Sequence, residues 1–113
     1  MSKQTDRSKV HEKYGKCCGY CGKSIELKEM QIDHISPKWS AKDVSVFHFD
    51  NLMPSCRRCN HYKREKNLEQ FRNFMLTLHE RVIDDYKNKV ALDYGIITVK
   101  PFDGIFHFEK QIT

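Results

Sequence analysis

Two pairs of cysteines with identical spacing constrain this chain more than any other feature. Cys18 and Cys21 form the first pair, and Cys56 and Cys59 form the second. Two residues between the partners let both thiolates of a pair reach one ion, and four thiolates complete the tetrahedral shell that Zn²⁺ prefers. Because that shell leaves no open position, the spacing predicts a structural zinc site. Cys17 is left over as a spare thiol.

A metal site suits a chain of 113 residues, because a core of this size is modest and often needs a metal or disulfides to stabilise it. The length predicts a single domain over 1–113, with a core over about 14–66 and an extension over about 67–113. The first alternative to a zinc site is that the four cysteines are buried separately and are unrelated. A thioredoxin-like redox site is disfavoured, because neither pair lies in a βαβ pattern.

The charge of the chain is concentrated in its first part. Residues 1–68 carry 14 Lys and Arg against 8 Asp and Glu, whereas residues 69–113 carry 6 against 7. A basic segment favours a polyanionic partner such as nucleic acid, and solubility alone is an equally good explanation. No run of 18 apolar residues suits a membrane span, and Met1–Tyr14 is too polar for a signal peptide. We therefore expect a cytoplasmic protein.

Local patterns predict an α+β fold. The predicted elements are a short helix near Thr5–Tyr14 that ends at Gly15, a β-like stretch at Met30–Ile35, a brief strand at Val44–Phe49 and a helix from about Cys59 to Lys66.

The C-terminal part shows two further patterns. Apolar residues recur at helical spacing from Leu68 to Val90, which predicts a long helix that Asn67 caps, with a kink or break as the alternative. The apolar stripe is either core or a dimer seam, and a homodimer is left open. Ile96–Lys100 and Ile105–Lys110 alternate around a turn, which predicts a terminal β-hairpin.

Polar residues with catalytic potential lie between and just after the cysteine pairs. Hydrolysis of a phosphodiester needs a base, a cation and groups that hold the phosphate in line. His34 can act as the base at neutral pH, and Asp33 and Asn60 offer oxygen ligands for Mg²⁺. Since neighbours on a strand point to opposite faces, Asp33 and His34 can share one site only where the strand ends or is distorted.

Basic residues surround Asn60. Lys63 and Arg64 follow it by three and four residues, which places them on the same face of the predicted helix. Beside a phosphate-cleaving site they can contact DNA phosphates, although such clusters are usually solvated helix faces. The predicted DNA-binding set is Arg57, Arg58, Lys63, Arg64 and Lys66.

The order and spacing of these motifs, over roughly residues 14–66, resemble the HNH endonuclease family. The matching segments are Cys18-Gly19-Tyr20-Cys21-Gly22, Ile32-Asp33-His34-Ile35-Ser36-Pro37, Asp50-Asn51-Leu52 and Cys56-Arg57-Arg58-Cys59-Asn60-His61-Tyr62-Lys63. The resemblance implies a ββα-metal core, in which two short strands and one helix hold a single divalent cation.

The resemblance also implies a role for each polar residue. Asp33 and Asn60 would bind the cation, with His61 as an alternative ligand, and His34 would be the general base. Asn51 would brace the loop through backbone hydrogen bonds and so orient the base. We expect a Mg²⁺-dependent DNA endonuclease, as in small phage or prophage relatives. The alternatives are a non-catalytic zinc module that binds DNA or protein, and an RNA-binding zinc protein, neither of which needs this catalytic set.

Overall fold

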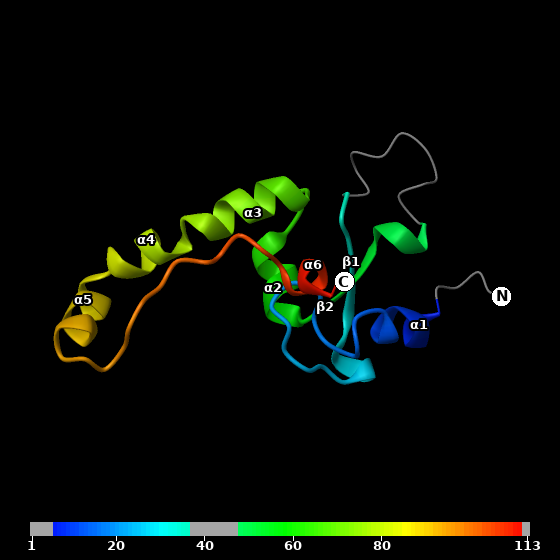
Figure 1. Ribbon diagram of the computed structural model, residues 1–113, viewed down its shortest axis with the longest axis horizontal. Helices are drawn as coiled ribbons and strands as arrows, with labels where there is room; N and C mark the ends of the chain where they lie inside the picture. Colours follow the sequence, from blue (N-terminus) through cyan, green and yellow to red (C-terminus); the bar gives the residue numbers. More distant parts are fainter. Residues whose placement is uncertain (1–5, 37–47, 112–113) are drawn as a thin grey trace. The chain divides into compact units, whose positions relative to one another are not determined.

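The computed structural model describes residues 6–36 and 48–111, and these divide into two compact units (Figure 1). The first unit comprises Met1–Leu68 and Phe106–Thr113, and the second comprises Glu69–Ile105. In the described residues, no helix is both long and apolar enough to cross a membrane. The elements of the first unit are α1 (Arg7–Glu12), the 3₁₀ helix η1 (Leu27–Glu29), β1 (Gln31–His34), the 3₁₀ helix η4 (Phe49–Asn51), β2 (Leu52–Ser55), α2 (Arg57–Lys63) and α6 (His107–Lys110).

The sheet of the first unit consists of β1 and β2, which pair antiparallel. Asp33 lies opposite Met53, and His34 lies opposite Leu52. The expected β-like stretch is therefore confirmed, and the chain combines helices with a small sheet as predicted. Buried side chains from several described elements form the core of the unit; they include Val10, Cys18, Tyr20, Ile25, Met30, Leu52, Met53 and Phe106.

The two expected helices of the first unit are present with shifted bounds. Asp6 caps α1 by accepting a hydrogen bond from the backbone N–H of Ser8, and Gly15 takes the expected left-handed conformation at φ 73°. The second helix begins before Cys59, because the sulfur of Cys56 accepts from the backbone N–H of Cys59 and caps α2. It ends at Lys63 rather than Lys66.

The brief strand expected at Val44–Phe49 falls mostly outside the described residues. Its described end is not a strand, because Phe49 begins η4. The backbone N–H of Asn51 donates to the carbonyl of His48 at 2.8 Å, which closes the tight turn that leads into β2.

The second unit contains three short helices in place of one long helix. They are α3 (Leu68–Leu76), α4 (Leu78–Ile83) and α5 (Tyr86–Asp93), and α3 begins directly after Asn67 as predicted. The first break occurs at Thr77, whose φ of −109° and ψ of 6° are not helical. The second break occurs where Asp85 accepts from the backbone N–H of Lys87 and caps α5. Short polar side chains thus interrupt a continuous apolar pattern.

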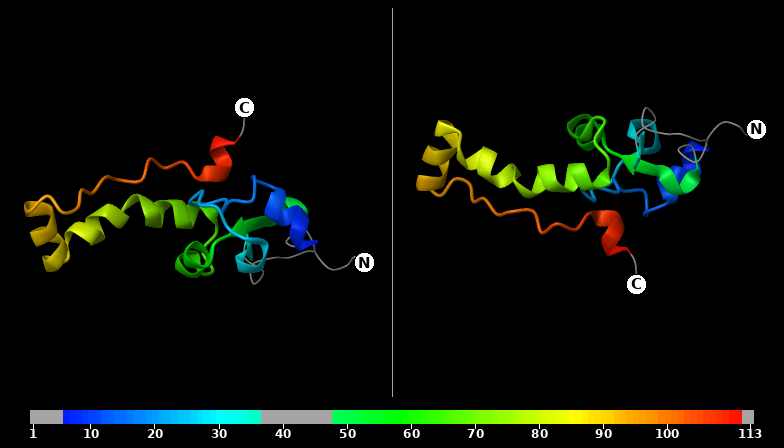
Figure 2. Two further views of the ribbon diagram at one scale, coloured as in Figure 1. Left: turned by 90° about the horizontal axis from the view of Figure 1, so that it is seen from below. Right: turned by 90° about the horizontal axis from the view of Figure 1, so that it is seen from above.

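The predicted C-terminal hairpin is wrong. In the described part of the chain, the sheet contains β1 and β2 only, and residues 96–105 form neither a strand nor a helix. Figure 2 shows this segment returning along α4 and α3. Val99 and Phe102 are half-buried and line a groove together with apolar residues of those helices. Residues expected in the other strand form α6, which starts where Glu109 accepts from the backbone N–H of Phe106 at 2.8 Å.

Candidate metal centre and active site

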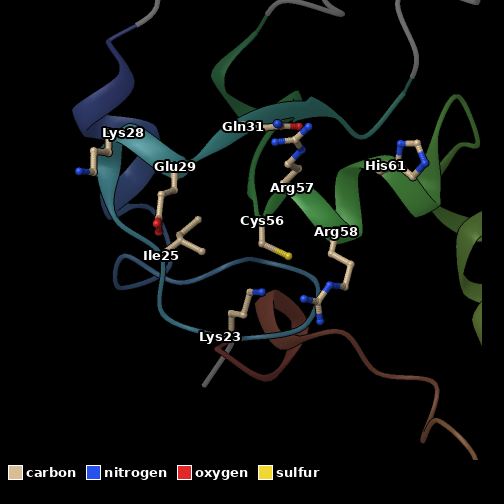
Figure 3. Close-up of a pocket in the computed structure, with 9 residues that line it drawn as sticks. All are labelled: Lys23, Ile25, Lys28, Glu29, Gln31, Cys56, Arg57, Arg58 and His61. Atoms are coloured by element: carbon tan, nitrogen blue, oxygen red, sulfur yellow. The ribbon is translucent and has the colours of Figure 1, made fainter.

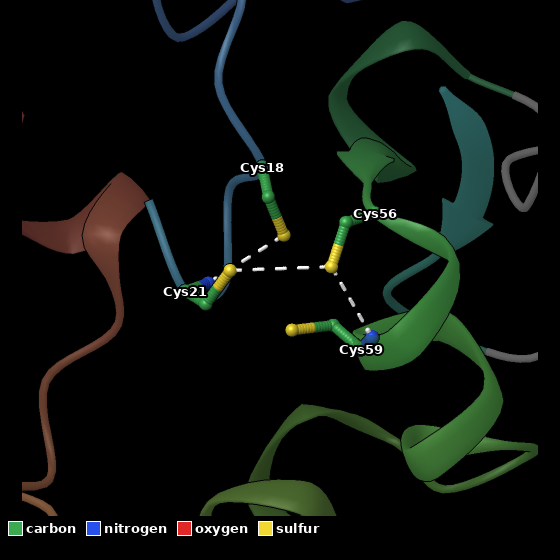
Figure 4. Close-up of side chains that lie close together, drawn as sticks. All are labelled: Cys18, Cys21, Cys56 and Cys59. Carbon is green, nitrogen blue, oxygen red and sulfur yellow. Dashed lines mark hydrogen bonds between the residues drawn. The ribbon is translucent and has the colours of Figure 1, made fainter. Parts of the chain in front are cut away.

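The four paired cysteines meet in one cluster. The sulfur atoms of Cys18, Cys21, Cys56 and Cys59 all lie within 4.8 Å of one another, and Figure 4 shows them converging on a common centre. A tetrahedral zinc site with Zn–S bonds of about 2.3 Å places its sulfur atoms about 3.8 Å apart. The cluster can therefore bind a metal such as zinc, as the spacing predicted. Cys17 is not part of the cluster.

Each cysteine pair folds into the same local turn. The sulfur of the first cysteine accepts a backbone N–H bond from the second, at 3.5 Å for Cys18 and 3.3 Å for Cys56. Hydrogen bonds from the thiols of Cys21 and Cys59 lower the pKa of Cys18, and the bonds that Cys59 donates raise its own pKa. The cluster therefore contains one sulfur, that of Cys18, that favours the thiolate form in which cysteine binds a cation.

Residues from the end of the chain pack on the first cysteine turn. The backbone N–H groups of His107 and Phe108 donate to the carbonyls of Tyr20 and Gly19, at 3.1 and 2.8 Å. The rings of Tyr20 and Phe106 pack edge to face with their centroids 5.3 Å apart. The sequence pattern gave no sign of this contact, because the alternation of apolar residues there suggested a strand.

A buried ion pair joins β1 to α2. The Lys63 ammonium lies 3.0 Å from Oδ2 of Asp33 and donates to the backbone carbonyl of His34 at 3.1 Å. Lys63 is 0% exposed and Asp33 only 7%. The expectation that Lys63 contacts DNA phosphates is therefore wrong, because its charge is used inside the fold and does not reach the surface.

Tyr20 is a second partner of Asp33 that sequence reasoning missed. Its hydroxyl donates to Oδ2 of Asp33 at 2.5 Å. Burial and the negative charge of Asp33 raise the pKa of Tyr20, so the phenol keeps its proton and remains a donor. The position of Tyr20 inside the first cysteine turn links this turn directly to the polar residues of β1.

Asn60 lies on the same side of α2 as Lys63 and also contacts β1. Its side-chain N–H donates to Oε1 of Gln31 at 2.5 Å. Gln31 and Asp33 are two residues apart on the strand and so share a face. The structure thus brings Asp33 and Asn60 to one β1–α2 interface, while alternation directs the half-buried side chain of His34 to the other face at the last position of the strand.

The residues that follow His34 are held by Asn51. Its Oδ1 accepts from the backbone N–H of Ser36 at 2.8 Å, and its side-chain N–H donates to the Ser36 carbonyl at 3.2 Å. The backbone carbonyl of Asn51 accepts from the N–H of Ile35 at 2.9 Å. Three hydrogen bonds therefore fix the backbone just beyond His34.

Comparison with known proteins identifies the segment that contains these residues. Residues 18–66 match the sequence model of the family described as HNH endonuclease. We call residues 18–66 the HNH domain after this match. A protein of Vibrio cholerae serotype O1 biovar El Tor, named "Retron Vc95 putative HNH endonuclease", is 36% identical over 56 residues. That match covers 48% of this chain and 27% of the relative, so the chain spans about a quarter of that protein. No solved structure matches the chain.

The HNH domain presents several cations at its surface. Arg57, Arg58 and Arg64 are exposed, and Lys66 is half-exposed. His61, the alternative ligand, is also exposed. With Lys63 buried, four of the five basic residues that the sequence suggested for DNA contact remain accessible in the HNH domain. This arrangement, together with the family assignment, suggests a nuclease.

Proposed function

We propose that this protein is a metal-dependent DNA endonuclease whose HNH domain hydrolyses phosphodiester bonds with His34 as the general base. The observation that carries the proposal is the contact between β1 and α2. It brings the strand that carries Asp33 against the helix that carries Asn60, and His34 is the last residue of that strand, within the segment that matches the family. A carboxylate and an amide at one interface, with a histidine at the end of the same strand, are the residue types that hydrolysis assisted by one cation requires.

The zinc ion in this proposal has a structural role. Four thiolates complete its coordination shell, so no position is left for water or substrate. The ion would join the turn around Cys18 and Cys21 to the start of α2, where Cys56 and Cys59 lie. Because α2 carries Asn60 and Lys63, zinc binding would also fix the β1–α2 interface.

Mg²⁺ or another divalent cation would be held by Asp33 and Asn60. Oδ2 of Asp33 is bonded to Tyr20 and Lys63, while among the described residues Oδ1 accepts no hydrogen bond. Asn60 uses its N–H group on Gln31, and within the same residues its carbonyl oxygen has no donor. One oxygen of each residue is thus left for a hard cation. When bound, the cation supplies positive charge to the phosphate and the leaving oxygen.

The other polar residues would prepare the site for reaction. The His34 imidazole would take a proton from the attacking water, while Asn51 holds the backbone beyond it. Lys63 would act as a positioning residue, because one ammonium contacts both Asp33 and the His34 carbonyl. The accessible basic residues Arg57, Arg58, Arg64 and Lys66 would contact DNA phosphates.

A plasmid assay tests the proposal. Zinc-loaded protein should convert supercoiled plasmid to nicked or linear product with Mg²⁺ and not without it, and the nicks should be sealed by DNA ligase if the ends carry 5′-phosphate and 3′-hydroxyl groups. His34→Ala should reduce the rate by about 100-fold or more, as for loss of a general base. His79→Ala in α4 is the matched control and should cut normally, whereas a folded His34→Ala protein with full activity would contradict the assignment.

A non-catalytic zinc module is a second candidate, and one observation favours it. Asp33 is buried and ion-paired, as a carboxylate with a purely structural role would be. Under this alternative, zinc-loaded wild-type protein binds DNA or a protein but leaves the plasmid intact with Mg²⁺ or Mn²⁺. That result would replace the nuclease proposal with a binding function.

A further inference from the structure

An open groove lies beside the zinc-binding cluster in the first unit (Figure 3). Its volume is about 660 Å³, and its walls come from the loop after the first cysteine pair, from η1 and β1, and from the start of α2. Two of its basic residues, Arg57 and Arg58, belong to the predicted DNA-binding set, whereas Lys23 and Lys28 do not. The lining residues are Lys23, Ile25, Lys28, Glu29, Gln31, Cys56, Arg57, Arg58 and His61.

Positive charge dominates this groove. Figure 3 shows Lys23 and Arg58 pointing into the opening from opposite walls, while Lys28 lies at the edge. Glu29 is the single acidic residue among those lining the groove in the described part of the chain. Lys28 has an acidic neighbour in Glu26, but the pair is 4.0 Å apart and largely exposed, so it neutralises little. Two cations that face a shared opening favour an anion between them.

We propose that this groove binds the phosphate backbone of duplex DNA on one side of the bond to be cut. The inference rests on the proposed function, because the groove meets the candidate active site through Gln31. That residue lines the groove, and its Oε1 accepts the hydrogen bond from Asn60. DNA would therefore extend from the β1–α2 interface across the start of α2 towards Lys23.

The composition of the lining favours duplex over single-stranded DNA. Within the described residues, the groove is lined by no Phe, Tyr or Trp. Proteins that bind single strands usually stack unpaired bases on such rings, whereas contacts to a duplex backbone need only cations and polar groups. Among the described residues, the groove offers cations and polar groups but no aromatic rings.

A competing explanation is that Lys23 and Arg58 only balance the charge of the zinc site. Zn²⁺ with four thiolates carries two net negative charges, and one of its ligands, Cys56, lines the groove. Charge balance predicts that loss of both cations weakens zinc retention and leaves DNA binding unaltered. Contact with the DNA backbone predicts instead that DNA binding weakens and zinc retention is unchanged.

The test compares charge-matched double variants in a His34→Ala background, so that cleavage cannot alter the DNA. Lys23→Gln/Arg58→Gln removes the two converging cations, and Lys87→Gln/Lys89→Gln removes two exposed cations from α5. Binding to a short duplex and to one of its single strands is measured over a range of KCl concentrations. Zinc content and Tm are measured on every protein.

Loss of two phosphate contacts should lower the slope of log affinity against log salt concentration by about 1.8, at about 0.9 for each contact. The α5 variant should keep the parent slope. Glu29→Gln should tighten duplex binding because it removes the negative charge of the groove lining. Glutamine keeps the oxygen that accepts from the backbone N–H of Glu26, so the local fold should be retained.

Three results would overturn the proposal: an unchanged slope, an equal loss in the α5 variant, or zinc loss with DNA binding intact. Single-strand binding that equals duplex binding and falls equally in the groove variant would overturn the choice of duplex. Plasmid cleavage by the wild-type protein is scored separately. A reduced slope without cleavage therefore rejects the nuclease and supports the groove, and cleavage with an unchanged slope does the opposite.

Discussion

The ammonium of Lys63 is buried 3.0 Å from the carboxylate of Asp33. It also donates to the carbonyl of His34, so one charge holds two successive residues of β1 against α2. A lysine that spacing alone places beside DNA is thus part of the interior. The charge of Lys63 explains how the buried carboxylate of Asp33 is tolerated at the point where we propose a cation site.

Lys63→Met should destabilise the protein by about 3–5 kcal/mol, because Asp33 would stay buried without its cation. The double variant Lys63→Met/Asp33→Asn should recover part of this loss, since no unpaired charge remains. Urea denaturation of zinc-loaded protein measures both effects. The control is Lys28→Met, whose exposed ion pair with Glu26 is worth at most about 1 kcal/mol. Equal losses for Lys63→Met and Lys28→Met would show that the buried pair does not stabilise the fold.

Cys59→Ser should abolish stable zinc binding and unfold the first unit. Structural zinc contributes about 10–16 kcal/mol of apparent binding free energy in small zinc domains, which exceeds the stability of most domains. Zinc content and circular dichroism measure the result. Cys17→Ser is the matched control, because Cys17 lies outside the cluster, and it should retain both zinc and structure. A Cys59→Ser protein with the same Tm as its parent would show that zinc does not stabilise the fold.

Asn51→Ala should reduce DNA cleavage more than it reduces stability. The substitution removes two hydrogen bonds to Ser36, a loss of about 1–2 kcal/mol in unfolding free energy. Cleavage should fall by about 10-fold or more, because small displacements of a base are costly. Asn51→Asp keeps the acceptor for the Ser36 N–H and should retain more activity. Wild-type cleavage by a less stable Asn51→Ala protein would confine this residue to a structural role.

Gly22→Ala should destabilise the first unit more than Gly15→Ala. Both glycines have positive φ, at 86° and 73°, so alanine costs about 1–2 kcal/mol at either position. At Gly22 the added Cβ would also lie 2.8 Å from Nδ1 of His107, whereas at Gly15 it meets no atom within 4 Å. Adding His107→Ala should relieve only the Gly22 variant. Equal Tm losses for the two glycine variants would argue against tight packing between α6 and the cysteine turn.

The clustered cysteines and the elements around them could be predicted from the sequence because their signals are local. Identical spacing identified Cys18, Cys21, Cys56 and Cys59, and the β-like stretch before Ser36-Pro37 became β1. The start of α2 was misplaced because the sulfur of Cys56 acts as its cap, a role usually filled by Ser, Thr, Asp or Asn. The catalytic roles of His34, Asn51 and Asn60 remain predictions.

The errors arose where tertiary contacts decide between equally good local patterns. Helical spacing placed Asn60, Lys63 and Arg64 near one another, but it could not show that Lys63 faces β1 while Arg64 faces solvent. Alternation suggested a hairpin of two strands at Ile96–Lys100 and Ile105–Lys110, whereas Val99 and Phe102 line a groove with residues of α3 and α4. Because α6 packs on Gly19 and Tyr20 through its backbone N–H groups, the contact produces no periodic pattern of apolar residues in the sequence.

The docking of α6 on the first cysteine turn gives the chain a nested order. Helices α3, α4 and α5 are translated after α2, and only then do His107 and Phe108 supply the N–H groups that donate to the carbonyls of Tyr20 and Gly19. On the ribosome, a nascent chain that ends within the second unit would lack this cover over the cysteine turn. Final packing of the HNH domain must therefore wait until the intervening helices have emerged.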